Sequence, residues 1–225
     1  MNLIEILNDN HITYTENEPM SAHTTFKIGG AADILITVGN LSELQTVISA
    51  CKDCGMPYMI LGNGSNLLVS DQGIEGAVIA LDGDFKEISV ESETVTAGAG
   101  AKLSRLCTVA MEHSLSGLEF AYGIPGTVGG AMYMNAGAYG GEMKDVALSV
   151  TALSPDGSVR EVPAAEMALG YRTSVFKTNG DGITWAQVFY LVCNIINHLI
   201  VGVLFGSVVI YIINIWIVCE ICIEC

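Results

Sequence analysis

The chain has 225 residues, enough for one or two domains with a buried core, and it carries 24 acidic residues against 9 basic ones, a net charge of −15. This acidity excludes nucleic acid as the main partner, because contacts to a phosphate backbone need clustered cations. It does not exclude a small anionic ligand, since backbone N–H groups bind phosphate without lysine. The first ten residues include acids and lack the basic and apolar stretches of a secretory signal, so the sequence predicts a cytoplasmic protein.

The first 80 residues alternate between strand and helix patterns. The predicted elements, in order, are a short helix over Leu3–Leu7, a strand over Asp33–Val38, a helix ending before Gly55, and strands over Tyr58–Leu61 and Gly76–Leu81. Ser42 and Gln45 fit a capping box at the start of the second helix. The alternation predicts a small α/β unit.

The next hundred or so residues combine strand patterns with one strongly amphipathic helix. Strands are expected within Ile88–Ala97 and over Val150–Leu153 and Val159–Val162, and a short helix from Pro163 to Gly170. The helix over Ala101–His113 places apolar side chains at the i, i+3, i+4, i+7, i+8 spacing: Leu103, Leu106, Cys107, Ala110 and Met111.

Three glycine-rich turns stand out along this pattern. The first, Gly62–Leu67, follows a strand directly, and its small residues would let the backbone approach a pyrophosphate closely. It has neither the Gly-Lys-Ser/Thr of a Walker A loop nor the third glycine of a dinucleotide fingerprint, so a plain tight turn is an alternative. The second, Ala97–Gly100, lies between a strand and a helix, where an ordinary connection is also an alternative.

The third glycine-rich segment is the strongest indication of a ligand. Eight glycines fall between Gly117 and Gly141, and each raises the conformational entropy lost on folding. Apolar residues among them, such as Ile124 and Val128, argue against a solvated linker. Close packing of bare backbone against a flat, extended ligand explains the composition.

Five motifs in register resemble the UDP-N-acetylenolpyruvoylglucosamine reductase family of bacterial peptidoglycan synthesis. They are HTTFKIGGAAD (23–33), LGNGSNLLVSDQGIEGAVI (61–79), AGAG (97–100), GLEFAYGIPGTVGGAMYMNAGAYGGEMKDV (117–146) and GYRTSVFK (170–177). The resemblance implies an α/β (α+β) FAD-binding fold of the vanillyl-alcohol-oxidase or PCMH type. It implies one FAD-binding subdomain over 1–80 and a second over 81–178, followed by an atypical hydrophobic tail over 179–225 that the family lacks.

The same resemblance implies the ligands and the site. The cofactors would be FAD and NADPH as hydride donor, and a UDP-sugar would be reduced at its enolpyruvyl double bond. Arg172 matches the family's active-site arginine, and Tyr171 its neighbour in the substrate pocket. The residues expected at the cofactor are Gly62, Asn63, Gly64, Ser65, Asn66, Leu67, Gly123, Ile124, Pro125, Gly126, Thr127, Gly129, Gly130, Asn135, Ala136 and Gly137.

The family pattern stops after Lys177. The proton-donating serine and the assisting glutamate of the family's substrate domain have no matched position, so the chain as given is expected to be inactive or nearly so. From Gly182 to Cys219 the sequence carries no Asp, Glu, Lys or Arg. Three interpretations stay open: an out-of-frame or chimeric C-terminus, a membrane anchor, or a buried soluble element.

Two alternatives to the reductase follow from this ending. The chain could be an FAD-binding fragment without turnover, or a membrane-tethered flavin oxidoreductase of the same fold. A membrane partner is expected only if the tail is genuine. Cys51-x-x-Cys54 lacks the context of a thioredoxin-like redox motif, and Cys219-x-x-Cys222-x-x-Cys225 lacks the partner ligands of a metal site, so no metal is predicted.

Overall fold

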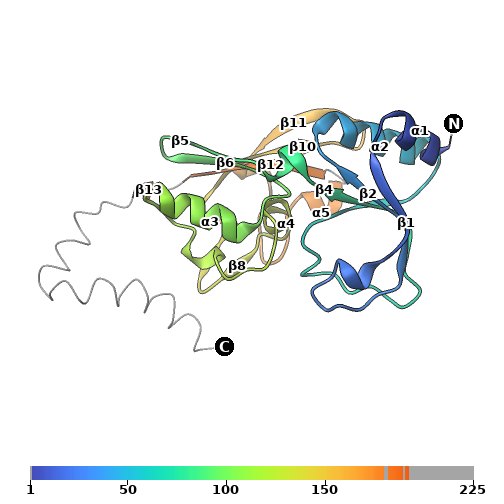
Figure 1. Cartoon of the computed structure of the whole chain (residues 1–225). Coiled ribbons are helices and arrows are strands. Elements are labelled where there is room, and N and C mark those ends of the chain that lie inside the picture. Colours follow the sequence, from blue (N-terminus) through green and yellow to red (C-terminus); the bar gives the residue numbers. More distant parts are fainter. Residues whose placement is uncertain (1, 180–181, 190, 193–225) are drawn as a thin grey trace, which may run out of the picture.

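The computed structural model describes residues 2–179, 182–189 and 191–192, which form two regions, each built on one β-sheet (Figure 1). The first region has a four-stranded sheet in the order β1-β2-β4-β3. Its strands are β1 (Thr13–Pro19), β2 (Ala31–Val38), β3 (Tyr58–Leu61) and β4 (Ile74–Leu81). β1 is antiparallel to β2, whereas β2, β4 and β3 are parallel to one another.

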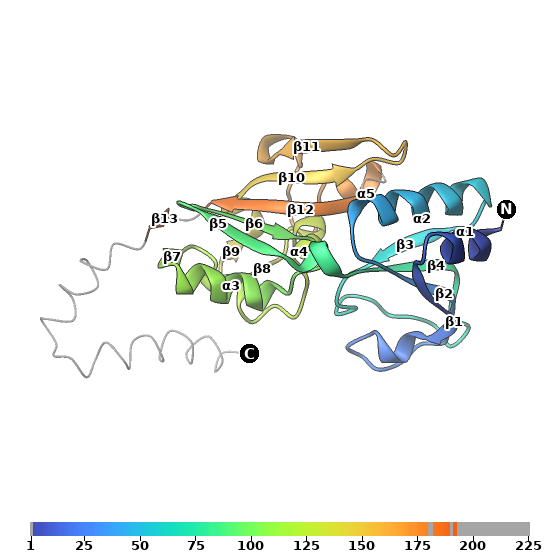
Figure 2. The same ribbon diagram turned by 45° about the horizontal axis from the view of Figure 1, so that its top comes forward.

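Helices α1 (Leu3–Asp9) and α2 (Leu41–Asp53) pack against the first sheet (Figure 2). The apolar face of α2, with Leu44, Val47 and Cys51, is fully buried in the same core as Ile36 of β2 and Ile79 of β4. Burying this stripe in the core fixes the helix on the sheet.

The predicted start of α2 is wrong by two residues. Asn40, not Ser42, is the N-cap, and its side chain accepts a hydrogen bond of 3.0 Å from the backbone N–H of Glu43. The Glu43 carboxylate accepts in turn from the backbone N–H of Gly39 at 2.6 Å. Asn caps helices as well as Ser does, and the acid three residues on reaches back to the residue before the cap. The predicted end is confirmed: Gly55 follows the cap with a φ of +64°.

The second region has a five-stranded antiparallel sheet in the order β11-β10-β12-β6-β5. Its strands are β5 (Ile88–Glu91), β6 (Thr94–Gly98), β10 (Ala147–Leu153), β11 (Val159–Pro163) and β12 (Gly182–Phe189). Helices α3 (Leu103–Glu112) and α4 (Val128–Met134) lie on one face of this sheet (Figure 2). The α/β class predicted from the sequence is therefore confirmed.

Shorter elements connect these parts of the two regions. They are the 3₁₀ helices η1 (Met20–Ala22), η2 (Gly83–Lys86), η3 (Glu119–Ala121), η4 (Met143–Asp145) and η5 (Ala164–Glu166), the helix α5 (Phe176–Asn179), and the strands β7 (Leu115–Ser116), β8 (Gly137–Ala138), β9 (Gly141–Glu142) and β13 (Leu191–Val192). β7 pairs with β13, and β8 pairs with β9.

Two local predictions in the second region need correction. Met111 was expected on the buried face of α3 but is 70% exposed, and Val109 is buried instead. The helix expected from Pro163 to Gly170 is only the single turn η5, for which Pro163 is the N-cap. Ala168 has a φ of +48°, a left-handed conformation that ends helical geometry before Gly170.

Strand β12 lies beyond the boundary that the sequence suggested at 178, yet it is the central strand of the second sheet. It pairs with β10 on one side and with β6 on the other. The division into 1–80, 81–178 and 179–225 stays a prediction. The remainder of the apolar tail, from 193 to 225, lies outside the described residues, together with its cysteine motif. Among the helices described above, none combines the length and apolar character needed to cross a membrane.

Candidate functional site

The three glycine-rich turns meet where the two regions face each other. The side-chain amide of Asn63, in the first turn, donates a hydrogen bond of 2.9 Å to the carbonyl of Pro125, in the third. The backbone N–H of Gly129, in the third, donates to the carbonyl of Ala99, in the second, also at 2.9 Å. A Cβ on Gly62 would lie 2.9 Å from the hydroxyl of Thr127. Segments far apart in the sequence thus share one cleft.

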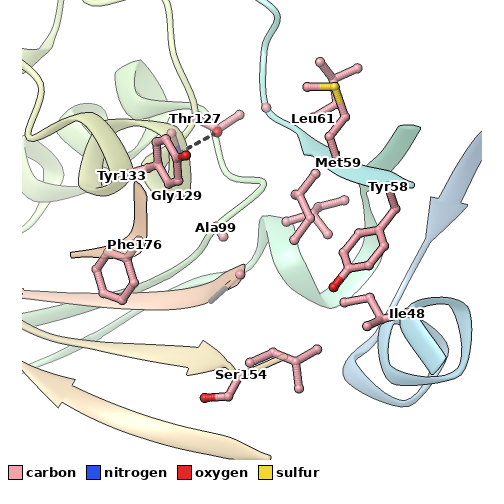
Figure 3. Close-up of a pocket in the computed structure, with 16 residues that line it drawn as sticks. Ile48, Tyr58, Met59, Leu61, Ala99, Thr127, Gly129, Tyr133, Ser154 and Phe176 are labelled. Carbon is pink, nitrogen blue, oxygen red and sulfur yellow. Dashed lines mark hydrogen bonds between the residues drawn. The ribbon is translucent and has the colours of Figure 1, made fainter. Parts of the chain in front are cut away.

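A cavity of about 390 Å³ opens at this junction, with walls from both regions (Figure 3). The side chains of Ile48, Tyr58 and Met59 come from the first region, and those of Tyr133 and Phe176 from the second. The remaining lining residues are Ile60, Leu61, Gly62, Leu81, Ala99, Thr127, Gly129, Gly130, Leu153, Ser154 and Gly182. Two mostly apolar walls on either side of a gap suit a flat aromatic ring.

A second cavity of about 410 Å³ adjoins the first and shares Gly62 and Thr127 with it. Three of the nine basic residues line it: Lys86, Lys102 and Arg105. Lys86 forms a 2.8 Å ion pair with Asp82, and its hydrogen bond is the main reason that the pKa of Asp82 is lowered. Arg105 lies 3.4 Å from Glu112. This wall concentrates positive charge in an otherwise acidic chain, although two of its cations already have acidic partners.

The first turn presents free backbone donors. Among the contacts within the described part of the chain, none is donated by the backbone N–H groups of Asn63, Gly64, Ser65 or Asn66. The turn is held by Gly64, whose φ is +61° and whose position leaves no room for a Cβ, since one would lie 1.9 Å from the carbonyl oxygen of His23. Consecutive free amides in a glycine-containing turn form a concave site for anions.

The third turn contains glycines that the protein's own packing does not require. A Cβ on Gly123 or Gly126 would meet no described atom within 4 Å, and neither residue has a left-handed φ. Gly129 differs, because a Cβ there would lie 2.7 Å from that of Ala99. The internal structure therefore explains Gly129 but not Gly123 or Gly126, and space beside these two is left for another molecule.

The predicted cofactor residues fall into two groups. Gly62, Thr127, Gly129 and Gly130 line the first cavity, and Asn63 lines the second together with Gly62 and Thr127. The others line neither: Gly64, Ser65, Asn66, Leu67, Gly123, Ile124, Pro125, Gly126, Asn135, Ala136 and Gly137. Leu67 packs against the smaller of the two apolar clusters, Ile124 packs against the larger, and Ala136 is buried. All of these positions are still carried by the glycine-rich turns or by the end of α4.

The predicted catalytic pair lies on an exposed loop outside both cavities. Tyr171 is 89% exposed, and Arg172 adopts a left-handed backbone with a φ of +53°. The loop is closed by two backbone hydrogen bonds between Gly170 and Thr173, of 3.1 and 3.2 Å. This arrangement leaves both side chains available to a molecule that approaches from solvent.

Sequence reasoning missed the aromatic walls of the first cavity. Tyr58 was assigned only to a strand, and Phe176 only to a family motif. Burial, followed by the nearby Cys51, raises the pKa of Tyr58 above its ordinary value, so the phenol stays protonated. No local pattern could have revealed these side chains, because they converge only when β3 and α5 are brought together by the fold.

Comparison with known proteins agrees with this geometry. A family model described as FAD binding domain matches residues 32–163. UDP-N-acetylenolpyruvoylglucosamine reductase from Alkaliphilus oremlandii is 49% identical over 164 residues, which are 73% of this chain and 54% of that protein. The one from Bacillus velezensis is 40% identical over 191 residues, 84% of this chain and 63% of that protein. The chain spans about half the length of several curated relatives that it matches.

Solved structures support the same fold. The UDP-N-acetylenolpyruvylglucosamine reductase of Thermus caldophilus superposes with a TM-score of 0.69 at 36% identity, covering 80% of this chain and 62% of that one. BBE-like 1 from Physcomitrella patens has a TM-score of 0.63 at 17% identity, covering 85% of this chain and 44% of that one. The predicted FAD-binding fold of the vanillyl-alcohol-oxidase or PCMH type is confirmed.

Proposed function

Because this chain belongs to the FAD binding domain family, we propose that it holds FAD between its two regions and provides the flavin-binding part of a UDP-N-acetylenolpyruvoylglucosamine reductase. FAD follows from the family, and the substrate from the relatives' activity. NADPH as the hydride donor is proposed on the same resemblance. When bound, FAD supplies two-electron chemistry, accepting a hydride from a nicotinamide and delivering it to a substrate carbon.

One observation carries the proposal: Gly123 and Gly126 are glycines for which the protein's own packing gives no reason. A Cβ at either position would enter open space, and Gly126 directly precedes Thr127, which lines both cavities. A ligand that packs on the bare backbone of this turn explains both residues. The residues present therefore fit an extended dinucleotide with a flat ring system.

The free amides of Asn63–Asn66 would hold the diphosphate of the cofactor. They supply hydrogen-bond donors without a formal charge, which suits a chain with a net charge of −15. An aromatic ring of the dinucleotide would lie between Tyr58 on one wall and Tyr133 and Phe176 on the other, in the apolar cavity. That cavity would exclude water from one end of the ligand and orient it.

Arg172 and Tyr171 are proposed to face the substrate. A guanidinium stays charged at any physiological pH and can stabilise negative charge that develops on an enolpyruvyl group during reduction. Tyr171, the most exposed of the large hydrophobic side chains described, would contact the UDP-sugar. We further propose that the 225 residues bind FAD with little or no turnover, because the family's proton-donating serine and assisting glutamate have no matched position in the sequence.

The test of FAD binding uses glycine-to-alanine variants that leave the fold intact. Gly123→Ala and Gly126→Ala should keep the unfolding temperature of the parent, yet weaken FAD binding about ten-fold or more, because the added methyl occupies the ligand's space. Gly39→Ala is the matched control, since its Cβ would make only an ordinary 3.5 Å contact with Glu43 and it lines neither cavity. Titration of FAD, followed by flavin fluorescence and absorbance, measures the affinity.

Two results would contradict the proposal. A parent chain that binds no FAD at micromolar concentrations would reject it outright. Equal FAD affinity in the parent, both turn variants and Gly39→Ala would reject the site. Turnover is tested separately, as NADPH oxidation that depends on the UDP-enolpyruvyl sugar, and full activity of the 225-residue chain would contradict the expected lack of turnover.

A further inference from the structure

The loop that carries Tyr171 and Arg172 is anchored at one end by a buried amide. Asn135 is only 2% exposed, and its Nδ2 donates a hydrogen bond of 2.9 Å to the carbonyl of Gly170, the first residue of the loop. The second Nδ2 hydrogen goes to the carboxylate of Glu142 at 2.6 Å. The Oδ1 atom accepts from the backbone N–H of Lys144 at 2.9 Å. Both donor hydrogens of this amide are therefore used within the chain.

The Glu142 carboxylate, which accepts the hydrogen bond from Asn135, is itself held in place. Glu142 Oε2 lies 3.0 Å from the Lys144 ammonium, and the backbone N–H of Glu142 donates to Asp145 at 2.8 Å. Asn135 thus joins the loop to a small charged cluster at β9 and η4. A hydrogen bond to an ionised acceptor is stronger than a neutral one, so the amide is firmly oriented.

The other end of the loop is tied to the same helix. Ser174 is 4% exposed, and its hydroxyl donates a 2.6 Å hydrogen bond to the carbonyl of Tyr133. Tyr133 lies in the last turn of α4, and Asn135 is the C-cap of that helix, with a left-handed φ of +43°. The first residues of α4 include Gly129 and Gly130, which line the cavity. One short helix therefore links the cavity wall to both ends of the loop.

We propose that Asn135 is a positioning residue, which fixes the Tyr171–Arg172 loop relative to the cavity and does not hold a cofactor through its side chain. Its relevance to catalysis rests on the proposed function, because only that function gives Arg172 a task. The anchoring itself depends on hydrogen bonds within the chain. The sequence placed Asn135 among the cofactor residues; its backbone N–H donates to the carbonyl of Met132, so its backbone carbonyl is the group left for such a contact.

The residue type fits this role. The backbone at 135 is left-handed, a conformation that Asn tolerates better than most residues and that Gly adopts freely. Asn135→Gly therefore removes the three side-chain hydrogen bonds while it keeps the backbone conformation. Asn17→Gly is the matched control: Asn17 also has a positive φ, of +54°, but it is exposed in β1, and within the described part of the chain its side chain makes no hydrogen bond.

The experiment is hydrogen exchange of the 225-residue chain without FAD, measured by mass spectrometry. The amides of Gly170, Thr173 and Val175 report on the loop, because each donates a backbone hydrogen bond inside or next to it. Asn135→Gly should speed their exchange about ten-fold, with no change in β2 or β4, whereas Asn17→Gly should leave them unchanged. Ser174→Ala should speed the same amides from the other end.

Other outcomes would overturn the inference. Unchanged loop exchange in both Asn135→Gly and Ser174→Ala would show that these bonds do not anchor the loop. If Asn135→Gly accelerates exchange throughout the second sheet, Ser174→Ala tests whether the loop can open alone. If Ser174→Ala also accelerates exchange throughout the sheet, the proposal that these bonds anchor only the loop is rejected. An FAD affinity lost in Asn135→Gly, with loop exchange intact, would make the side chain a ligand. Failure of the parent to bind FAD would reject the proposed function alone, since exchange is read without FAD.

Discussion

The two sheets differ in how much of the sequence each one needs. All four strands of the first sheet come from residues 13–81, and its parallel core is complete before the second sheet begins. The second sheet starts at β5 and stays incomplete until β12, which inserts between β6 and β10. The loop that carries Arg172 precedes that strand in the sequence, with helix α5 between them. We therefore expect order in the loop to depend on closure of the second sheet, while the first turn follows a strand of a sheet that is complete by residue 81.

Removing β12 is expected to have the largest effect of the changes considered, because it should disrupt the second sheet and leave the first one intact. A chain ending at Asn179 would leave β6 and β10 without the partner that joins them, with eleven residue pairs of the sheet lost. We expect the second sheet to lose its protection from hydrogen exchange and FAD binding to disappear, while the first sheet stays protected. A chain ending at Val192 is the control and should match the parent in both. If the Asn179 chain binds FAD and keeps slow exchange in β6, β12 is not needed to close the site.

Two glycines of the first region sharpen the same comparison. Gly64 and Gly73 both have a positive φ, and a Cβ would lie 1.9 Å from the carbonyl of His23 in one case and 1.8 Å from that of Ala31 in the other. Alanine at either position should lower the free energy of unfolding by about 1–3 kcal/mol, because both turns must shift. Only Gly64→Ala should also weaken FAD binding, since Gly64 lies between the free amides of the first turn. Urea denaturation and FAD titration measure the two effects.

Equal loss of FAD affinity in Gly64→Ala and Gly73→Ala would trace the effect to general destabilisation of the first region. If both variants are as stable as the parent, these turns accommodate the added methyl group without a cost in the free energy of unfolding.

Each sheet contains one strand whose place the sequence did not predict, β1 in the first and β12 in the second. Strand β3 and the end of α2 at Gly55 follow from local signals, and both are where the pattern places them. The start of α2 was missed because Asn40 and Ser42 are both good caps, and only the contact to Glu43 distinguishes them. The place of β12 was missed because an uncharged apolar stretch has the same composition whether it forms a central strand or something else.

Some residues of the candidate site could be predicted from local sequence, and others become apparent only in the fold. Glycine turns are visible in the sequence because their chemistry is local, and the structure brings all three together. The anchoring role of Asn135 could not be seen, because Gly170, Glu142 and Lys144 reach it only through the fold. The aromatic wall from Tyr58 and Phe176 was hidden for the same reason.

Two buried thiols allow the smallest and most local comparison of the regions. Burial raises the pKa of Cys51, in α2, to about 11 and that of Cys107, in α3, to about 12, from an ordinary value of 9.0. A raised pKa in the folded state means that the protonated thiols favour folding fully below pH 9. This contribution is lost as the pH rises from 9 towards 11 and 12, because the unfolded chain ionises first. Each thiol can contribute at most about 1.4 kcal/mol per pH unit in its window.

The prediction is a fall in the free energy of unfolding between pH 9 and 10.5, shared by the two regions. Cys51→Ala should make the free energy of unfolding of the first region fall less steeply with pH, and Cys107→Ala should do the same for the second region. Both effects are expected whatever each substitution does to stability at pH 8. Cys54→Ala, at an exposed position of the same helix end, should leave most of the slope in place. Urea denaturation at several pH values, followed by exchange in each sheet, separates the regions. If the pH dependence of the free energy of unfolding is unchanged in both Cys51→Ala and Cys107→Ala, the two thiols ionise as easily in the folded chain as in the unfolded one. Burial in α2 and α3 would then not disfavour the thiolates.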